Sequence, residues 1–227
     1  MDSDLNREDR EMYKRRQFLK LGFGIIAGLS SLFSPLFLAA KWVYAQGRRT
    51  ILPKNTSRES LINKDPSTLD TRYLELTDLK DFKTMGESDH KVDINTWQLE
   101  IKGCVKKPFR LNYQEILELP SIEKDVLLIC PGFFANHGRW KGISMPDLFE
   151  KTGLSEKARY MTVTGPSGWG DKVERFPIED VLSKKVFLAY EVNGKTLPIK
   201  NGFPLRIVAE GYYGDDWVKY VRKVVFE

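Results

Sequence analysis

The sequence predicts an α+β fold, a β-rich mixed sheet domain with short helices, and three observations lead to this prediction. Residues 97–101 and 160–164 alternate apolar and polar side chains, as half-buried strands do. The apolar run Val126–Ile129 indicates a buried strand that stops at Cys130, where a Pro-Gly pair follows. The helical segments are short, because capping residues, prolines and glycines bound them closely.

The remaining elements follow in chain order. A helix is expected at Tyr113–Leu119, with Asn112 as its N-cap, and another at Met145–Leu154, with Ser144 as its N-cap. Further strands are expected at 186–192, 205–209 and 218–226.

Composition bounds the class of protein. The chain has 227 residues, is 41% hydrophobic and carries a net charge of +5, which suits one globular domain with a real core. No Lys/Arg cluster interleaved with aromatic residues is present, so nucleic-acid binding is not expected. Two cysteines and two histidines are too few for a disulfide framework or a zinc site, so most ligands of any metal must come from elsewhere.

The N-terminal region resembles a twin-arginine export signal. Arg15-Arg16 precede Gln-Phe-Leu-Lys, and a weakly apolar run follows at 21–40. We therefore expect residues 1–45 to be a signal peptide or an uncleaved membrane anchor, and the protein to be periplasmic. Residues 46–80 are polar and predict a linker, and residues 81–227 predict the main domain. The resemblance also implies the twin-arginine translocase as a partner during export.

Three sequence blocks resemble the molybdopterin-binding domain of the sulfite oxidase family. The first joins Cys130 to a Trp-x-Gly turn at 140–142 and a short helix. The second is the W-x-L-x-I-x-G pattern that begins at Trp97, and the third is the Gly-x-Pro-Leu-Arg string that ends at Arg206. The resemblance implies that family's fold, Mo-molybdopterin as the cofactor, and Cys130 as a thiolate ligand of the metal.

The resemblance also carries the expected cofactor-binding residues. Arg206 can grip a phosphate with its planar fork, and Lys219 adds a point charge. The full set that we expect to contact the cofactor is Lys83, Thr84, Thr164, Asn201, Arg206, Trp217, Val218 and Lys219.

The predicted activity follows from the cofactor. The resemblance implies transfer of an oxygen atom, with two electrons, at a sulfur or nitrogen centre, with reduction of S-oxides such as methionine sulfoxide favoured and sulfite oxidation as the alternative. We expect the loop Phe133–Arg139 to form the substrate wall, with His137, Arg139 and Phe134 as candidate substrate contacts. No haem-attachment motif is present, so a membrane haem protein or a cytochrome is expected to exchange the electrons.

Two other interpretations stay open at this point. An exported, non-enzymatic domain would use Cys104 and Cys130 for a structural disulfide, which an oxidising periplasm permits. A degenerate relative would bind the pterin without turnover, and the pair Asp215-Asp216, where the family usually has a basic residue, is the main departure in that direction.

Overall fold

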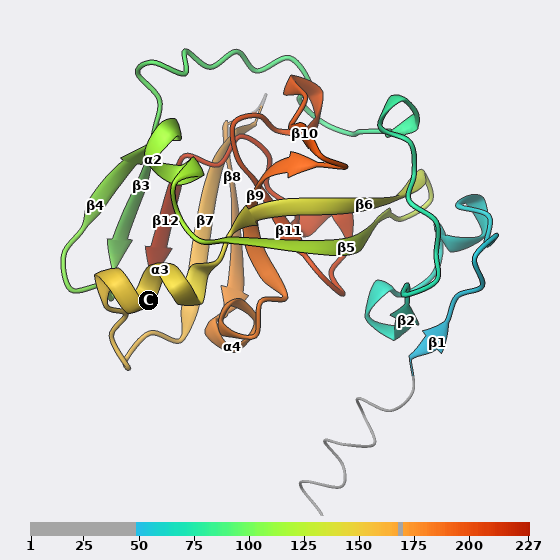
Figure 1. The fold of residues 1–227 in the computed structure, drawn as a ribbon, viewed down its shortest axis with the longest axis horizontal. Coiled ribbons are helices and arrows are strands. Elements are labelled where there is room, and N and C mark those ends of the chain that lie inside the picture. Colours follow the sequence, from blue (N-terminus) through green and yellow to red (C-terminus); the bar gives the residue numbers. More distant parts are fainter. Residues whose placement is uncertain (1–48, 168–169) are drawn as a thin grey trace, which may run out of the picture. The chain divides into compact units, whose positions relative to one another are not determined.

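Two five-stranded sheets form the framework of the residues that the computed structural model describes, 49–167 and 170–227. They belong to one unit that runs from Thr50 to Glu227 (Figure 1). The predicted export signal lies outside the described residues. Within the described ranges, no helix has the length and apolar character needed to cross a membrane.

The first sheet is antiparallel and carries a long hairpin. Its strands are β5 (Ser121–Cys130), β6 (Phe134–Ile143), β9 (Val186–Val192), β10 (Lys195–Thr196) and β11 (Arg206–Ala209). The hairpin of β5 and β6 pairs from Ser121 opposite Ile143 to Cys130 opposite Phe134. Cys130 therefore ends its strand next to the turn, as predicted.

The second sheet is mixed, as the predicted fold class requires. Its strands are β3 (Gln98–Gly103), β4 (Phe109–Asn112), β7 (Tyr160–Ser167), β8 (Gly170–Pro177) and β12 (Lys223–Phe226). In the order β4-β3-β12-β7-β8, the central β12 runs parallel to β3 and antiparallel to β7. One cluster of buried apolar side chains joins this sheet to the first, so the two share a core.

The helices are short, and local sequence explains their ends. They are α2 (Tyr113–Leu117), α3 (Met145–Thr152) and α4 (Ile178–Leu182). Asn112 and Glu115 form a reciprocal capping box at the start of α2. Ser144 occupies the N-cap position of α3 as predicted, but its side chain makes no capping hydrogen bond.

Two expectations need correction, and one further strand is absent from the prediction. The predicted loop at 133–139 is mostly strand β6, because its polar residues pair along β5. Strand β8 was not predicted, since its alternation is carried largely by charged residues. The last strand is confined to 223–226, because the chain before it turns at Tyr220, whose φ is +54°.

Residues 50–80, expected to be a polar linker, pack against the outer face of the hairpin. Leu52, Leu61, Leu69 and Leu74 are buried against β5 and β6 residues that face away from the main core. This segment also contains the short parallel pair β1 (Thr50–Ile51) and β2 (Leu69–Asp70). Figure 1 shows it beside the tip of the hairpin. The end of the hairpin next to its turn is therefore covered on both faces.

The capping box gives a stability prediction. Asn112→Ala should lower the free energy of unfolding by about 1 kcal/mol, because the backbone N–H of Glu115 loses its acceptor. Urea unfolding measures this loss. Gln114→Ala, an exposed change in the same helix, is the matched control. Equal stability of the two variants would contradict the capping role.

Candidate functional site

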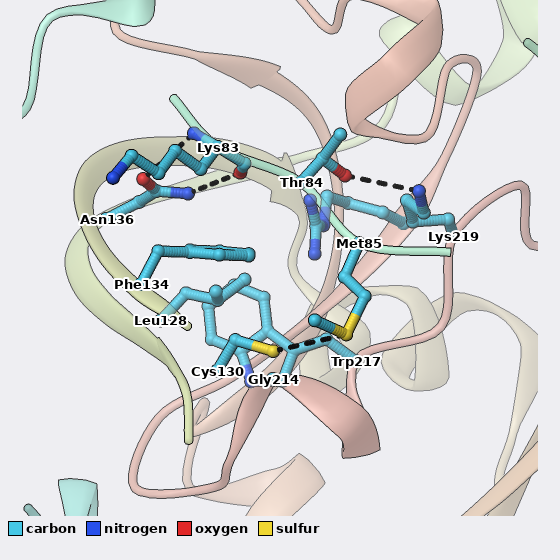
Figure 2. Close-up of a pocket in the computed structure, with 11 residues that line it drawn as sticks. Lys83, Thr84, Met85, Leu128, Cys130, Phe134, Asn136, Gly214, Trp217 and Lys219 are labelled. Carbon is cyan, nitrogen blue, oxygen red and sulfur yellow. Dashed lines mark hydrogen bonds between the residues drawn. The ribbon is translucent and has the colours of Figure 1, made fainter. Parts of the chain in front are cut away.

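A pocket opens where the hairpin meets the segment after β11 (Figure 2). Its empty volume is about 370 Å³ when the open solvent at its mouth is included. Four stretches of chain supply its walls: the loop before β3, the end of the hairpin, the start of β11 and residues 214–219. The lining residues are Lys83, Thr84, Met85, Leu128, Cys130, Phe134, Asn136, Arg206, Gly214, Trp217 and Lys219.

Cys130 provides the thiol of this pocket. It is buried at the end of β5, and its Sγ lies 3.7 Å from the Met85 Sδ. Burial and the nearby charge of Asp215 raise the pKa of the Cys130 thiol. A metal cation bound to the sulfur would reverse this preference and favour the thiolate.

The structure argues against the disulfide interpretation. Cys104 and Cys130 are both free cysteines. Cys104 follows β3, and its backbone N–H donates to the Phe226 carbonyl in the second sheet, whereas Cys130 ends a strand of the first. The two thiols therefore belong to different sheets, and only Cys130 lines the pocket.

Arg206 is a buried cation at the other end of the pocket, only 4% exposed. Its Nη1 donates to the Asn201 carbonyl at 2.9 Å, and its guanidinium lies 4.9 Å from the ring centroid of Trp140 and 5.2 Å from that of Trp217. Among the described residues, no carboxylate pairs with it, and burial lowers its pKa below the usual range. An anionic ligand would compensate this buried charge.

Lys219 adds a second cation beside Arg206. Its ammonium donates to the Thr84 Oγ1 at 3.2 Å and to the backbone carbonyl of Glu87. Burial, and then the charge of Arg206, lower the pKa of Lys219 to about 8. Thr84 in turn donates to the Lys200 carbonyl at 3.1 Å, so the hydroxyl joins the loop before β3 to this cationic end.

Asn136 fixes the loop that forms the pocket's upper wall in Figure 2. Its Nδ2 donates to the Lys83 carbonyl at 2.8 Å, and its Oδ1 accepts from the Lys83 N–H at 3.2 Å. Sequence reasoning missed this residue. The signal was the two-residue period of β6, which places Asn136 on the same face as Phe134.

The same period carries His137 away from the pocket. Its ring is 1% exposed and its Nδ1 lies 3.1 Å from the Glu75 carbonyl, on the face that residues 50–80 cover. Arg139 points elsewhere too, because its Nε donates to the Asp125 Oδ1 at 2.7 Å. That ion pair lowers the pKa of Asp125. Of the three candidate substrate contacts, the structure brings only Phe134 to the pocket.

Three expected cofactor contacts are buried next to the pocket rather than in its lining. Asn201 supplies the carbonyl that Arg206 binds. The Val218 carbonyl accepts a hydrogen bond from the Ile207 N–H, and the Thr164 carbonyl accepts one from the Arg222 N–H. The expected residues that do line the pocket are Lys83, Thr84, Cys130, Arg206, Trp217 and Lys219.

The polar groups of the site fit a phosphate-bearing cofactor. The buried Trp217 Nε1 and Asn201 Oδ1 have no partner within the described structure, so a donor and an acceptor are available near Arg206. The described residues contain no cluster of three or more His, Cys, Asp or Glu that would hold a metal. A metal at Cys130 would therefore depend on ligands from a cofactor, and soft sulfur ligands suit a thiolate site.

Comparison with known protein families supports the interpretation of this pocket as a cofactor site. Residues 85–227 match the model of the oxidoreductase molybdopterin binding domain. The oxidoreductase YuiH of Bacillus subtilis is 30% identical over 142 residues, which cover 62% of this chain and 70% of that protein.

Two longer relatives match over part of their length. The protein-methionine-sulfoxide reductase catalytic subunit MsrP of Gluconobacter oxydans is 26% identical, and the match covers 62% of this chain and 51% of MsrP. Nitrate reductase [NADH] 1 of Arabidopsis thaliana is 26% identical, with 60% of this chain and 18% of that protein covered. The sulfane dehydrogenase SoxCD of Paracoccus pantotrophus shares the fold, with a TM-score of 0.56, 18% identity, and coverage of 81% of this chain and 51% of that one.

Removal of the Asn136 clamp should loosen the pocket wall. Asn136→Ala leaves the Lys83 backbone without these partners and should cost about 1–3 kcal/mol of stability. Limited proteolysis should then cut near residues 82–90. Asn193→Gly, which removes a hydrogen bond from Asn193 to the Thr77 carbonyl, is the control and should leave that region protected. Equal cleavage of both variants would contradict the clamp.

The cationic end should bind anions in a pH-dependent way. Protonated Lys219 attracts an anion, and the charge is lost as the pH rises through about 8. Sulfate affinity of the cofactor-free protein, measured by calorimetry, should therefore fall by up to about tenfold from pH 7 to pH 9. Lys219→Arg keeps the charge and should remove most of this step. An unchanged step in that variant would exclude Lys219 as its source.

Proposed function

This chain belongs to the oxidoreductase molybdopterin-binding domain family and is a molybdopterin-dependent oxidoreductase, and we propose that it reduces S-oxides by oxygen-atom transfer. The observation that carries the proposal is that one pocket contains both the Cys130 thiol and the buried Arg206, which has no carboxylate partner among the described residues.

Each end of the pocket has its own task. Cys130 would hold the metal as a thiolate, while Arg206 and Lys219 would hold the phosphate of the pterin. Lys83, Thr84 and Trp217 would contact the rest of the organic ligand. When bound, the molybdenum cofactor supplies the two-electron oxygen chemistry, and the protein supplies binding, orientation and exclusion of water.

The mouth of the pocket favours a neutral, partly apolar substrate. Phe133 is 65% exposed and Met85 is 45% exposed, and Phe134 lines the pocket beside Cys130. Among the described residues, the one arginine that lines the pocket is Arg206, which we assign to the cofactor, and Arg139 is paired with Asp125 outside the lining. Sulfite oxidation stays the alternative. Lys83, an exposed cation in the pocket lining, would then be the contact for the anion.

The electrons would come from a separate protein. The sequence has two cysteines, one of which lines the pocket, so its own thiols cannot hold an iron–sulfur cluster. We propose a membrane haem protein or a cytochrome as the donor. The name of the relative MsrP, a catalytic subunit, supports a separate partner protein.

A periplasmic location is part of the same proposal. Its support is the sequence Arg15-Arg16-Gln-Phe-Leu-Lys and the apolar run after it. Retention of that run as a membrane anchor is the alternative.

The metal content of matched variants tests the proposal. Wild-type protein from a host that makes molybdopterin should contain near one molybdenum per chain. Cys130→Ser should lose the metal or the visible absorption of its thiolate bond, whereas Cys104→Ser should keep both. Dimethyl sulfoxide reduction with a reduced viologen dye then tests the direction of transfer. A loaded protein that oxidises sulfite but reduces no sulfoxide would overturn the proposed substrate.

A further inference from the structure

The turn at residues 214–216 is fixed against the end of β5. Tyr213 forms an isolated parallel bridge with Ile129, and Gly214 lines the pocket together with Cys130. A Cβ atom on residue 214 would lie 3.1 Å from the Ile129 carbonyl oxygen, so the two segments approach closely. Asp215 therefore projects from a turn that is held beside the thiol.

The turn carries two adjacent acidic residues, Asp215 and Asp216, neither of which lines the pocket. Asp215 is exposed, and within the described structure no Lys or Arg side chain forms an ion pair with its carboxylate. Lys172 donates to the Asp215 backbone carbonyl, but its ammonium pairs with Glu174 at 2.7 Å. Burial, and then the charges of Asp215 and Glu174, raise the pKa of the neighbouring Asp216. Lys172 thus has Glu174 as its ion-pair partner and contacts Asp215 only through the backbone carbonyl.

The cationic side chains of the pocket are directed away from Cys130. Arg206 is held by the Asn201 carbonyl and two indole rings, and Lys219 is held by Thr84 and backbone carbonyls. Figure 2 shows Lys219 and Thr84 at the end of the pocket away from Cys130, and the Lys83 side chain extending away from Cys130. Asp215 does not itself line the pocket, but it follows Gly214, which lines it beside Cys130, so its charge lies at the Cys130 end of the site.

We infer that Asp215 is a specificity-determining residue, whose carboxylate disfavours sulfite, nitrate and other oxoanions and so selects neutral or cationic oxygen-bearing substrates. The inference rests on the proposed function, because it concerns the substrate that reaches the metal held by Cys130. The physical basis is Coulomb repulsion across a few ångströms to about 10 Å of partly solvated pocket, which changes an anion's affinity by roughly three- to tenfold. A neutral S-oxide does not experience this repulsion.

Sulfate binding to the molybdenum-loaded protein tests the inference, because the bound cofactor would occupy Arg206 and Lys219. Sulfate affinity is measured by perturbation of the visible absorption, which requires no turnover. Asp215→Asn should tighten sulfate binding about threefold and Asp215→Lys about tenfold. Added sodium chloride should shrink both changes. Glu156→Gln, an exposed acid between α3 and β7 that does not line the pocket, is the matched control and should change nothing.

Kinetics with a neutral substrate separate this inference from the proposed function. Reduction of dimethyl sulfoxide should keep its kcat/KM within about twofold in the Asp215 variants, because charge does not act on a neutral molecule. Unchanged sulfate affinity in both variants, or an equal change in Glu156→Gln, would overturn the role of Asp215. Absence of sulfoxide reduction in loaded wild-type protein would overturn the proposed function, while the sulfate titration would still report on Asp215.

Discussion

The burial of the Arg206 guanidinium is the constraint on which the rest of the site depends. A charge without a carboxylate partner in a protein interior costs several kcal/mol unless other groups compensate it. Here backbone carbonyls and two indole faces compensate part of this cost. An anionic ligand would compensate more, so cofactor binding and the stability of the folded domain should be coupled.

The requirement to surround Arg206 explains the Trp-Lys-Gly pattern in β6. Trp140 is fully buried, donates its indole N–H to the Val126 carbonyl at 3.1 Å, and presents its ring to the guanidinium. Gly142 lets β6 approach β9, since a Cβ there would lie 1.9 Å from the Leu188 carbonyl oxygen. The pattern is therefore a packing device that places a strand and a ring around the cation.

The sequence was most informative where chemistry is local. The strand end at Cys130 and the capped helix after Asn112 could be predicted, because neighbours along the chain define them. Arg206 and Lys219 were expected from the family resemblance, and both line the pocket.

The contacts that complete the pocket depend on register between distant segments. Asn136 and His137 are adjacent polar residues, and only the pairing of β6 with β5 decides which one faces the pocket. The contact of Met85 with Cys130 joins residues 45 positions apart, and no local pattern indicates it.

Strand β12 has a consequence for synthesis on the ribosome. It comes after every other strand of its sheet along the chain, yet it occupies the centre and separates β3 from β7. The N-terminal half of that sheet emerges first but cannot pair with the later half until residues 223–226 have left the exit tunnel. The segment with Lys219 emerges just before these residues. The domain therefore acquires its continuous second sheet and its complete anion-binding end together, late in translation.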